Sequence, residues 1–237
     1  MKQSFRARVQ RGLRWLGFAV LTWLAVTIAM VFALRWIDPP VSSFMVRDRV
    51  AAWFDRDRSY HFEHQWVDYK HIAASMKVAV MASEDQKFPQ HRGFDFESME
   101  HAWDQNKRGH KIRGGSTITQ QTAKNLFLWP GRNLLRKGIE AWFTVLLETF
   151  CSKQRILELY LNSVEFGRGV FGVEAASKRY FHKSAAQLTT AESALLAAVL
   201  PAPKRFSVIR PSGYLRARQA WIMAQMPDVD TGSVLMH

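Results

Sequence analysis

The chain has 237 residues, of which 48% are hydrophobic and 22% charged, so it is neither a disordered nor a low-complexity protein. Lysine and arginine number 33 against 20 acidic residues, and the net charge of +13 favours an anionic partner: nucleic acid, anionic lipid or a phosphorylated substrate. The single cysteine, Cys151, excludes an intramolecular disulfide framework and a cysteine-based zinc site, and we expect it to be a buried small hydrophobe.

An apolar run near the amino terminus predicts a membrane anchor. Residues 15–34 carry no charge and span about 30 Å as a helix, which is enough to cross a bilayer. Only basic charges precede the run, so we expect this end to be cytoplasmic and the domain behind it to lie outside the cytoplasm. A cleaved signal peptide is the alternative, but its apolar core is shorter, roughly 7–15 residues. This placement argues against nucleic acid as the partner.

The remainder of the chain predicts one globular domain that is mainly α. Asp38-Pro39-Pro40 is expected to stop the membrane helix. Beyond it, apolar residues recur with helical spacing and alternating strand patterns are scarce. The sequence predicts helices over 72–84, 139–150, 152–162 and 189–200, the last opened by the capping box Thr189-x-x-Glu192. We expect a cytoplasmic basic tail at 1–14, a transmembrane anchor at 15–36, a juxtamembrane linker at 37–68 and the globular domain at 69–237.

The adjacent acids Glu84 and Asp85 are the first candidate for chemistry. They lie at the carboxyl end of a predicted apolar helix, where negative charge opposes the helix dipole, so capping explains them poorly. Glu84 falls on the same side as Val80 and should be partly buried. The pair is therefore either solvated or catalytic, and Glu84 is the candidate general base.

The second candidate is a glycine-rich junction. Gly114-Gly115-Ser116-Thr117 frees the backbone and offers a cap, so the helix that follows presents bare amides to an anion, with Lys124 beside it. It is no Walker loop, because Gly-Lys-Ser/Thr does not follow at the required spacing. The alternative is an ordinary capped junction between a loop and a helix.

The third candidate is Arg136-Lys137-x-x-Glu140. Arg136 and Glu140 are i, i+4 neighbours and can simply pair on a solvated face. However, Glu140 borders the apolar stripe of Ile139 and Phe143, which argues against full exposure. A carboxylate held among cations would position a diphosphate-bound metal.

Two further patterns are interpreted as structural. Gly167-x-Gly169-x-x-Gly172 matches a dinucleotide fingerprint, but a predicted helix precedes it where that site needs a strand. His61 and His64 have the spacing of metal ligands without a third ligand, and a juxtamembrane aromatic patch is the better interpretation.

Six motifs in this order resemble glycosyltransferase family 51, the glycosyltransferase module of bacterial peptidoglycan synthases. The matching strings are EDQKFPQHRG (84–93), GGSTITQQTAKN (114–125), RKGIE (136–140), ILELYLN (156–162), FGRGVFGVEAASKRYF (166–181) and LTTAESALLAAVLPAP (188–203). They cover residues 70–203. The sequence has neither Ser-x-x-Lys nor Lys-Thr-Gly, so it resembles the monofunctional members and we expect no transpeptidation.

The resemblance implies a lysozyme-like fold, with a large helical lobe and a small membrane-apposed jaw behind one amino-terminal transmembrane helix. It implies an enzyme that polymerises lipid II, a lipid-linked disaccharide-pentapeptide, into glycan strands with inversion and release of undecaprenyl diphosphate. Two alternatives are a lytic transglycosylase or lysozyme-like enzyme that cleaves glycan, and a non-catalytic, membrane-anchored cell-wall scaffold.

The resemblance also assigns roles by matching position. Glu84 becomes the general base, and Glu140 the second essential carboxylate, assisting the diphosphate or its metal. Donor phosphates would be held by Lys124 and Arg136. The other expected substrate-binding residues are Ser116, Thr117, Gln121, Asn125, Asp85, Phe88 and His91, and the expected supporting residues are Gly114, Gly115 and Glu158.

The implied partners are lipid II, the growing lipid-linked strand and the membrane, with no nucleic acid; cell-division or cell-wall synthesis proteins are left open. No organic cofactor is expected, and a divalent metal, Mg²⁺ or Mn²⁺, held by Glu140 through the diphosphate is left open. The implied location is the inner membrane, with a single pass and the catalytic domain in the periplasm.

Overall fold

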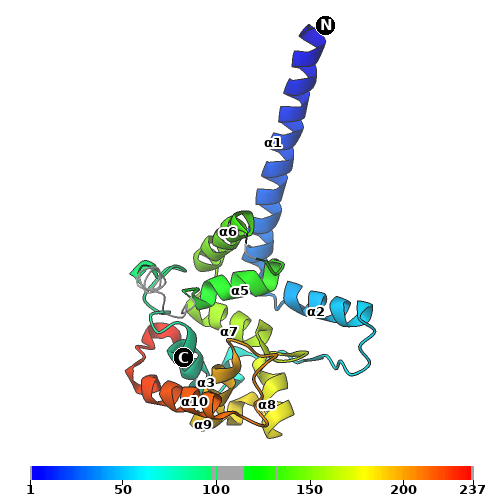
Figure 1. Cartoon of the computed structure of the whole chain (residues 1–237). Coiled ribbons are helices and arrows are strands. Elements are labelled where there is room, and N and C mark those ends of the chain that lie inside the picture. Colours follow the sequence, from blue (N-terminus) through cyan, green and yellow to red (C-terminus); the bar gives the residue numbers. More distant parts are fainter. Residues whose placement is uncertain (1, 98–99, 101–114, 132, 236–237) are drawn as a thin grey trace.

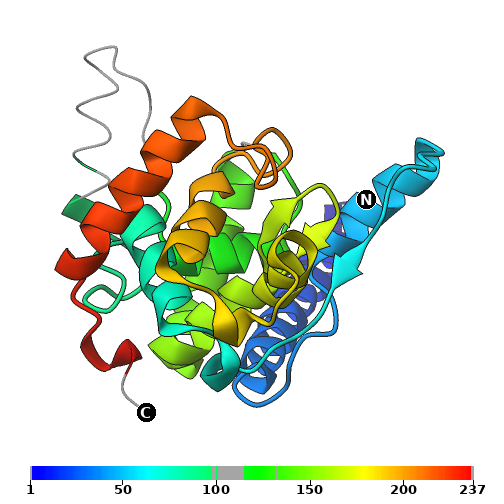
Figure 2. The same ribbon diagram turned by 90° about the horizontal axis from the view of Figure 1, so that it is seen from below.

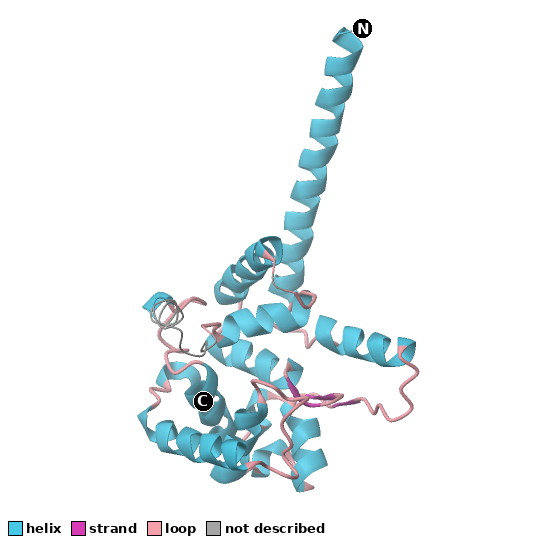
Figure 3. Ribbon diagram, in the orientation of Figure 1, coloured by secondary structure: helices cyan, strands magenta, loops and turns pink. Residues whose placement is uncertain are grey.

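The computed structural model describes residues 2–97, 100, 115–131 and 133–235 (Figure 1). Helices dominate the described residues, which confirms the mainly α prediction, and the strands form a small three-stranded sheet (Figure 3). The helices are α1 (Lys2–Ala33), α2 (Ser43–Phe54), α3 (Ala74–Glu84), α5 (Ile118–Phe127), α6 (Leu134–Phe150), α7 (Lys153–Ser163), α8 (Val173–Phe181), α9 (Thr190–Val199) and α10 (Gly213–Gln225). The strands are β1 (Glu63–His64), β2 (Glu165–Gly167) and β3 (Val170–Phe171), and short 3-10 turns lie at Tyr69–His71, Ala185–Gln187, Met226–Asp228 and Gly232–Val234.

Helix α1 extends far from the rest of the molecule (Figure 1). Its segment Gln10–Ala33 is long and apolar enough to cross a membrane. The helix ends at Ala33, and Arg155 of α7 binds the chain just beyond it. The Arg155 guanidinium donates hydrogen bonds to the carbonyls of Leu34 (2.8 Å) and Ile37 (3.0 Å). These bonds attach the carboxyl end of α1, called its foot below, to the domain.

Helix α6 packs along the lower part of α1. The Trp142 indole donates a hydrogen bond to the Thr27 hydroxyl (3.1 Å), and the rings of Phe32 and Phe150 meet edge to face with centroids 5.5 Å apart. Figure 1 shows α6 beside the foot of α1, with α9 and α10 at the opposite end of the domain. The segment of α1 that is long and apolar enough to cross a membrane therefore packs against α6.

Residues 37–68, predicted as a juxtamembrane linker, contact the globular domain in the structure. The Ser43 hydroxyl at the start of α2 lies within hydrogen-bonding distance of two carbonyls at the end of α5, those of Asn125 (3.0 Å) and Leu128 (2.6 Å). Strand β1 pairs in parallel with β3. The segment is folded onto the domain by contacts between residues far apart in the sequence, and no local sequence pattern predicts such contacts.

The core lies around α7. Every residue from Ile156 to Ser163 is buried, and α7 contacts α5, α6 and α8. Away from α1, the helices α3, α9 and α10 lie side by side (Figures 1 and 2). The predicted caps are confirmed: Ser152 accepts from the amide of Arg155 at the start of α7, and Thr189 forms the capping box with Glu192 at the start of α9. Local cap signals therefore place these helices.

The glycine-rich segment 167–172 forms a hairpin, in agreement with its structural interpretation. Strands β2 and β3 pair antiparallel, in the sheet order β1-β3-β2. Gly169 has φ +75°, and a Cβ there would lie 2.2 Å from the carbonyl oxygen of His61. Glycine is needed at position 169 so that β1 can lie close enough to pair with β3. The ring of Phe62 lies 6.0 Å from that of Phe171, so residues 61–64 do form an aromatic patch.

Candidate active site

Glu84 is the last residue of α3, and its carboxylate is held from several elements. The Gln121 side chain of α5 donates a hydrogen bond to Oε2 (2.9 Å), and the Ser83 hydroxyl donates to Oε1 (3.2 Å). The Glu84 side chain is 14% exposed, so the predicted partial burial is confirmed. A carboxylate that is held firmly and still reachable from solvent has the properties of a general base.

Asp85 ties the loop after α3 to the start of α5. Its carboxylate accepts from the backbone amide of Ile118 (2.9 Å) and from Nε2 of His91 (2.9 Å). His91 Nδ1 accepts from the amide of Gly93 (3.1 Å), which leaves the ring proton on Nε2. Phe88 is fully buried, with its ring against His91. The structure thus gives Asp85, Phe88 and His91 protein partners, and their effect is to fix the loop that follows the base.

Thr117 is the N-cap of α5. Its hydroxyl accepts from the amide of Gln120 (3.2 Å) and donates to the carbonyl of Gly93 (2.7 Å), so both of its hydrogen-bonding functions are used within the protein. Gly93 has φ +85°, and a Cβ there would lie 2.7 Å from the Thr144 methyl group. The junction is therefore a capped helix start, closely packed against α6.

We expect Thr117→Val to lower the free energy of unfolding by about 1–2 kcal/mol, because it removes a helix cap and leaves the Gly93 carbonyl without its donor. The melting temperature should fall by roughly 2–8 °C. Thr149→Val is the matched control, since that hydroxyl is exposed and bonds within its own helix. Thermal unfolding of the detergent-solubilised protein tests this, and equal melting temperatures for the two variants would contradict it.

Helix α5 connects the base to a cluster of cations. Gln121 touches Glu84, and Lys124 and Asn125 follow one turn later. Burial lowers the pKa of Lys124, while the carboxylates of Glu140 and Glu84 act in the opposite direction. The Lys124 ammonium thus interacts electrostatically with both predicted catalytic carboxylates and lies 5.9 Å from the ring centroid of Phe44 in α2.

The cation cluster lies on the first turns of α6. Arg136 pairs with Glu140 at 2.9 Å, and Lys137 pairs with the other Glu140 oxygen. The side chains of Arg136 and Glu140 are 9% and 3% exposed, so this is a buried pair and not the solvated pair left open above. Arg136 Nε is buried without a hydrogen-bond partner among the described residues. A donor without a partner beside two ammonium groups is suited to a phosphate oxygen.

The same cluster is poorly suited to hold a metal ion. Both oxygens of Glu140 are engaged by Arg136 and Lys137, whose positive charges repel a divalent cation. Among the described residues, no group of three or more His, Cys, Asp or Glu side chains is placed to hold a metal. These residues do not fit a metal held by the protein, and a metal brought in by the diphosphate stays a prediction.

Three supporting residues were also predicted. Glu158 accepts from the amide of Tyr69 (2.6 Å) and pairs with Arg155 (2.6 Å), so it supports the residue that binds the foot of α1. Gly115 and Ser116 are half-buried directly before Thr117. Gly114 lies outside the described residues.

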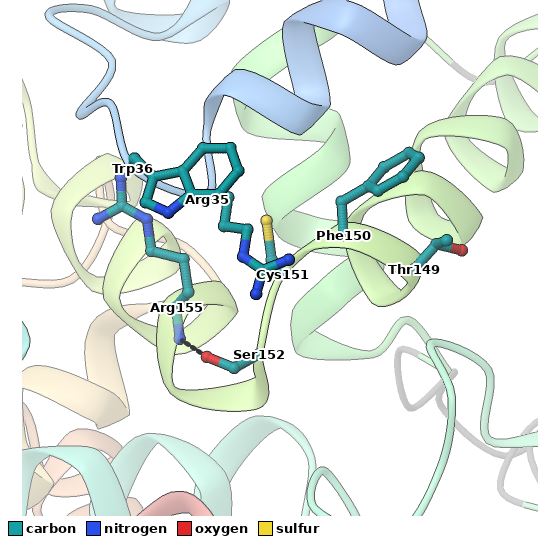
Figure 4. Close-up of a pocket in the computed structure, with 7 residues that line it drawn as sticks. All are labelled: Arg35, Trp36, Thr149, Phe150, Cys151, Ser152 and Arg155. Carbon is teal, nitrogen blue, oxygen red and sulfur yellow. Dashed lines mark hydrogen bonds between the residues drawn. The ribbon is translucent and has the colours of Figure 1, made fainter.

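A separate cavity of about 400 Å³ opens where α1 ends (Figure 4). Its lining residues are Arg35, Trp36, Thr149, Phe150, Cys151, Ser152 and Arg155. It shares no residue with the Glu84–Glu140 region. Cys151 is buried as predicted, and burial raises the pKa of its thiol to about 11, so the thiol is inert.

Two residues at the site were not identified from the sequence. Tyr160 of α7 is fully buried and donates to Gln121 Oε1 (3.3 Å), so it orients the amide that bonds the base; the helical pattern counted it only as apolar. Arg218 of α10 lies 3.7 Å from Glu84 Oε1. No local sequence pattern signals this position, because the contact of Arg218 with Ser83 joins residues 135 positions apart.

The chain is similar to proteins of one family. The family model described as Transglycosylase matches residues 50–227, a range that begins within α2 and includes all of α10. Three similar relatives carry the name biosynthetic peptidoglycan transglycosylase. They come from Xanthomonas axonopodis pv. citri strain 306 (51% identity; 92% of this chain, 89% of the relative), Shigella boydii serotype 4 strain Sb227 (57%; 86% and 85%) and Pseudomonas entomophila strain L48 (49%; 95% and 95%).

Proposed function

This chain belongs to the transglycosylase family and is a peptidoglycan glycosyltransferase, and from that premise we propose that its substrate is lipid II, which it polymerises with release of undecaprenyl diphosphate. The observation that carries this proposal is the place of Lys124 on α5. Lys124 lies one turn after Gln121, which bonds Glu84 (2.9 Å), and α5 packs against α6, the helix that carries Arg136 and Glu140. One site therefore combines a base for a hydroxyl with cations for a diphosphate.

In the proposed reaction, Glu84 removes the proton from the 4-hydroxyl of the acceptor sugar as its oxygen attacks the anomeric carbon of the donor. The bond from that carbon to the diphosphate oxygen breaks, and the leaving diphosphate keeps the electron pair. A single displacement inverts an α-linked donor to a β-linked product. One base is sufficient, because the diphosphate is already a good leaving group.

Lys124, Arg136 and Lys137 would stabilise the charge that develops on the leaving diphosphate. Fixed cations at a partly dehydrated site are effective there, because they need no rearrangement as the bond breaks. Glu140 holds Arg136 and Lys137 in place by pairing with both. We infer that Glu140 organises the cation cluster, since both of its oxygens are already engaged.

The placement of α1 supports a lipid substrate at this site. The apolar part of α1 packs against α6, the helix that carries Arg136 and Glu140. Exposed aromatic side chains, Trp53 and Phe54 of α2 and Trp129 after α5, lie on elements of the same end of the domain. With α1 as a single-pass anchor in the inner membrane and the domain in the periplasm, the cation cluster would lie at the depth of lipid headgroups.

Incubation of the full-length protein in detergent with labelled lipid II tests this proposal. We expect labelled strands longer than the disaccharide, which lysozyme digests to small fragments. A glycan-cleaving enzyme would instead release fragments from existing sacculus and leave lipid II unchanged. A membrane-anchored scaffold would neither cleave sacculus nor polymerise lipid II. Cleavage of sacculus without polymerisation, or no activity at all, would contradict the proposal.

A further inference from the structure

Arg218 is a charged residue of α10 that approaches Oε1 of the base, the oxygen that Gln121 of α5 does not bond. Its Nη2 lies 3.7 Å from Glu84 Oε1 and donates a hydrogen bond to the Ser83 hydroxyl (3.1 Å). Ser83 in turn donates to the same Glu84 oxygen (3.2 Å). From these contacts we infer that Arg218 is a positioning residue, which holds the Glu84 carboxylate in its reactive orientation both directly and through Ser83.

The contacts of Glu84 divide between its two oxygens. Gln121 donates to Oε2, whereas Arg218 and Ser83 face Oε1. With partners on both sides the carboxylate cannot rotate freely, and a base that must meet a hydroxyl within about 3 Å depends on such orientation. Gln121 and Arg218 therefore restrain different oxygens of the base, and Arg218 is the charged one of the two.

The fold places Arg218 there by the packing of α10. Leu215, Gln219 and Ile222 are buried, and Arg218 shares their face of the helix. The Gln219 side chain donates to the carbonyl of Ala191 at the start of α9 (2.6 Å), which fixes the rotation of α10 about its axis. The Arg218 side chain is 22% exposed, and its Nε is buried without a hydrogen-bond partner among the described residues. The guanidinium thus lies close to Glu84 and is largely shielded from solvent.

Arg218 lies outside the motifs that assign the other roles, which end at residue 203. The proposal rests on the proposed function of Glu84 as the base. The charged or titratable groups that face or adjoin Glu84 in the described part of the chain are Asp85, Lys124 of α5, Tyr160 of α7 and Arg218 of α10. Of these, Arg218 is the cation within 4 Å of the Glu84 carboxylate, at 3.7 Å from Oε1.

The test compares Arg218→Met with Arg216→Met by steady-state kinetics on labelled lipid II. Arg216 is the matched control, because it lies on the same helix, is exposed, and bonds only to Gln219 in the described structure. We expect Arg218→Met to lower kcat about 10–100-fold with little change in KM, since misplacing a catalytic group by about 1 Å costs up to 10²-fold. Arg216→Met should stay within about twofold of the wild type.

A purely structural role is separated by the charge-preserving variant. Both contacts of Arg218 are made by the single atom Nη2, so the ammonium of Arg218→Lys can replace it and should recover most of the kcat that Arg218→Met loses. Loss of side-chain packing alone would leave the two variants equally slow. Ser83→Ala should lower kcat by a smaller factor, about 3–10-fold, because it removes only one hydrogen bond.

The inference is overturned if Arg218→Met keeps kcat within about threefold, if Arg218→Lys recovers none of the lost kcat, or if Arg216→Met loses as much activity. Should both Arg218 variants fail to fold by circular dichroism, an unchanged kcat in Ser83→Ala would overturn it instead. Failure of the proposed function is a different result: the wild-type protein would then leave lipid II unpolymerised.

Discussion

Glu84→Gln is expected to abolish strand polymerisation while leaving the fold intact. Glutamine has the shape of glutamate and still accepts hydrogen bonds from Gln121 or Ser83, but it cannot take a proton from the acceptor hydroxyl. Loss of a general base typically costs about 10²–10⁴-fold in rate. The measurement is the initial rate of labelled strand formation, with thermal unfolding of the same sample as the check on folding.

The matched control is Glu63→Gln in β1. That carboxylate pairs with the half-exposed Arg179 away from the Glu84 region, and exposed pairs contribute at most about 1 kcal/mol. Its rate should stay within about twofold of the wild type. Activity of Glu84→Gln within tenfold of the wild type would remove Glu84 from the role of base. A Glu63→Gln rate that fell equally would show that the assay responds to stability and not to chemistry.

Features that depend on a few neighbouring residues could be predicted from the sequence. Thr117, Ser152 and Thr189 cap their helices as expected, because a cap depends on the side chain and the amides two or three residues later. The membrane-length apolar helix and the mainly α fold follow from composition and period in the same way. The pairing of Arg136 with Glu140 was also visible, since the two are one turn apart.

Features that depend on distant residues could not be predicted. Residues 37–68 contact the domain through distant partners, for example Ser43, whose hydroxyl bonds a carbonyl 82 positions later. Whether the Arg136–Glu140 pair is solvated or buried depends on how α6 packs against α1 and α5. Arg218 reaches Ser83 across 135 positions. In each case the deciding contact is tertiary, and the local sequence is compatible with either outcome.

Lys124→Ala is the variant that tests the diphosphate site. The ammonium would contact the donor diphosphate in the ground state and more strongly as charge develops on the leaving oxygen. Its removal should therefore lower kcat as well as weaken donor binding. A charge-assisted contact is worth roughly 1.5–3 kcal/mol, which corresponds to about 10–150-fold in kcat/KM. Steady-state kinetics with varied donor concentration separates the two effects.

The pH dependence adds a second, independent readout of Lys124. Because burial lowers the pKa of Lys124 in the free enzyme, the protonated form is lost at lower pH than for an exposed lysine, and kcat/KM should fall on the alkaline side. A bound diphosphate favours the protonated form, so the alkaline limb should lie at higher pH in kcat than in kcat/KM. In Lys124→Arg, which stays protonated, the limb should move to higher pH even if the rate is reduced. If Lys124→Ala retained normal kcat and donor affinity, the segment from Gly115 to Lys124 would be only a capped helix start, and the diphosphate would have to bind elsewhere.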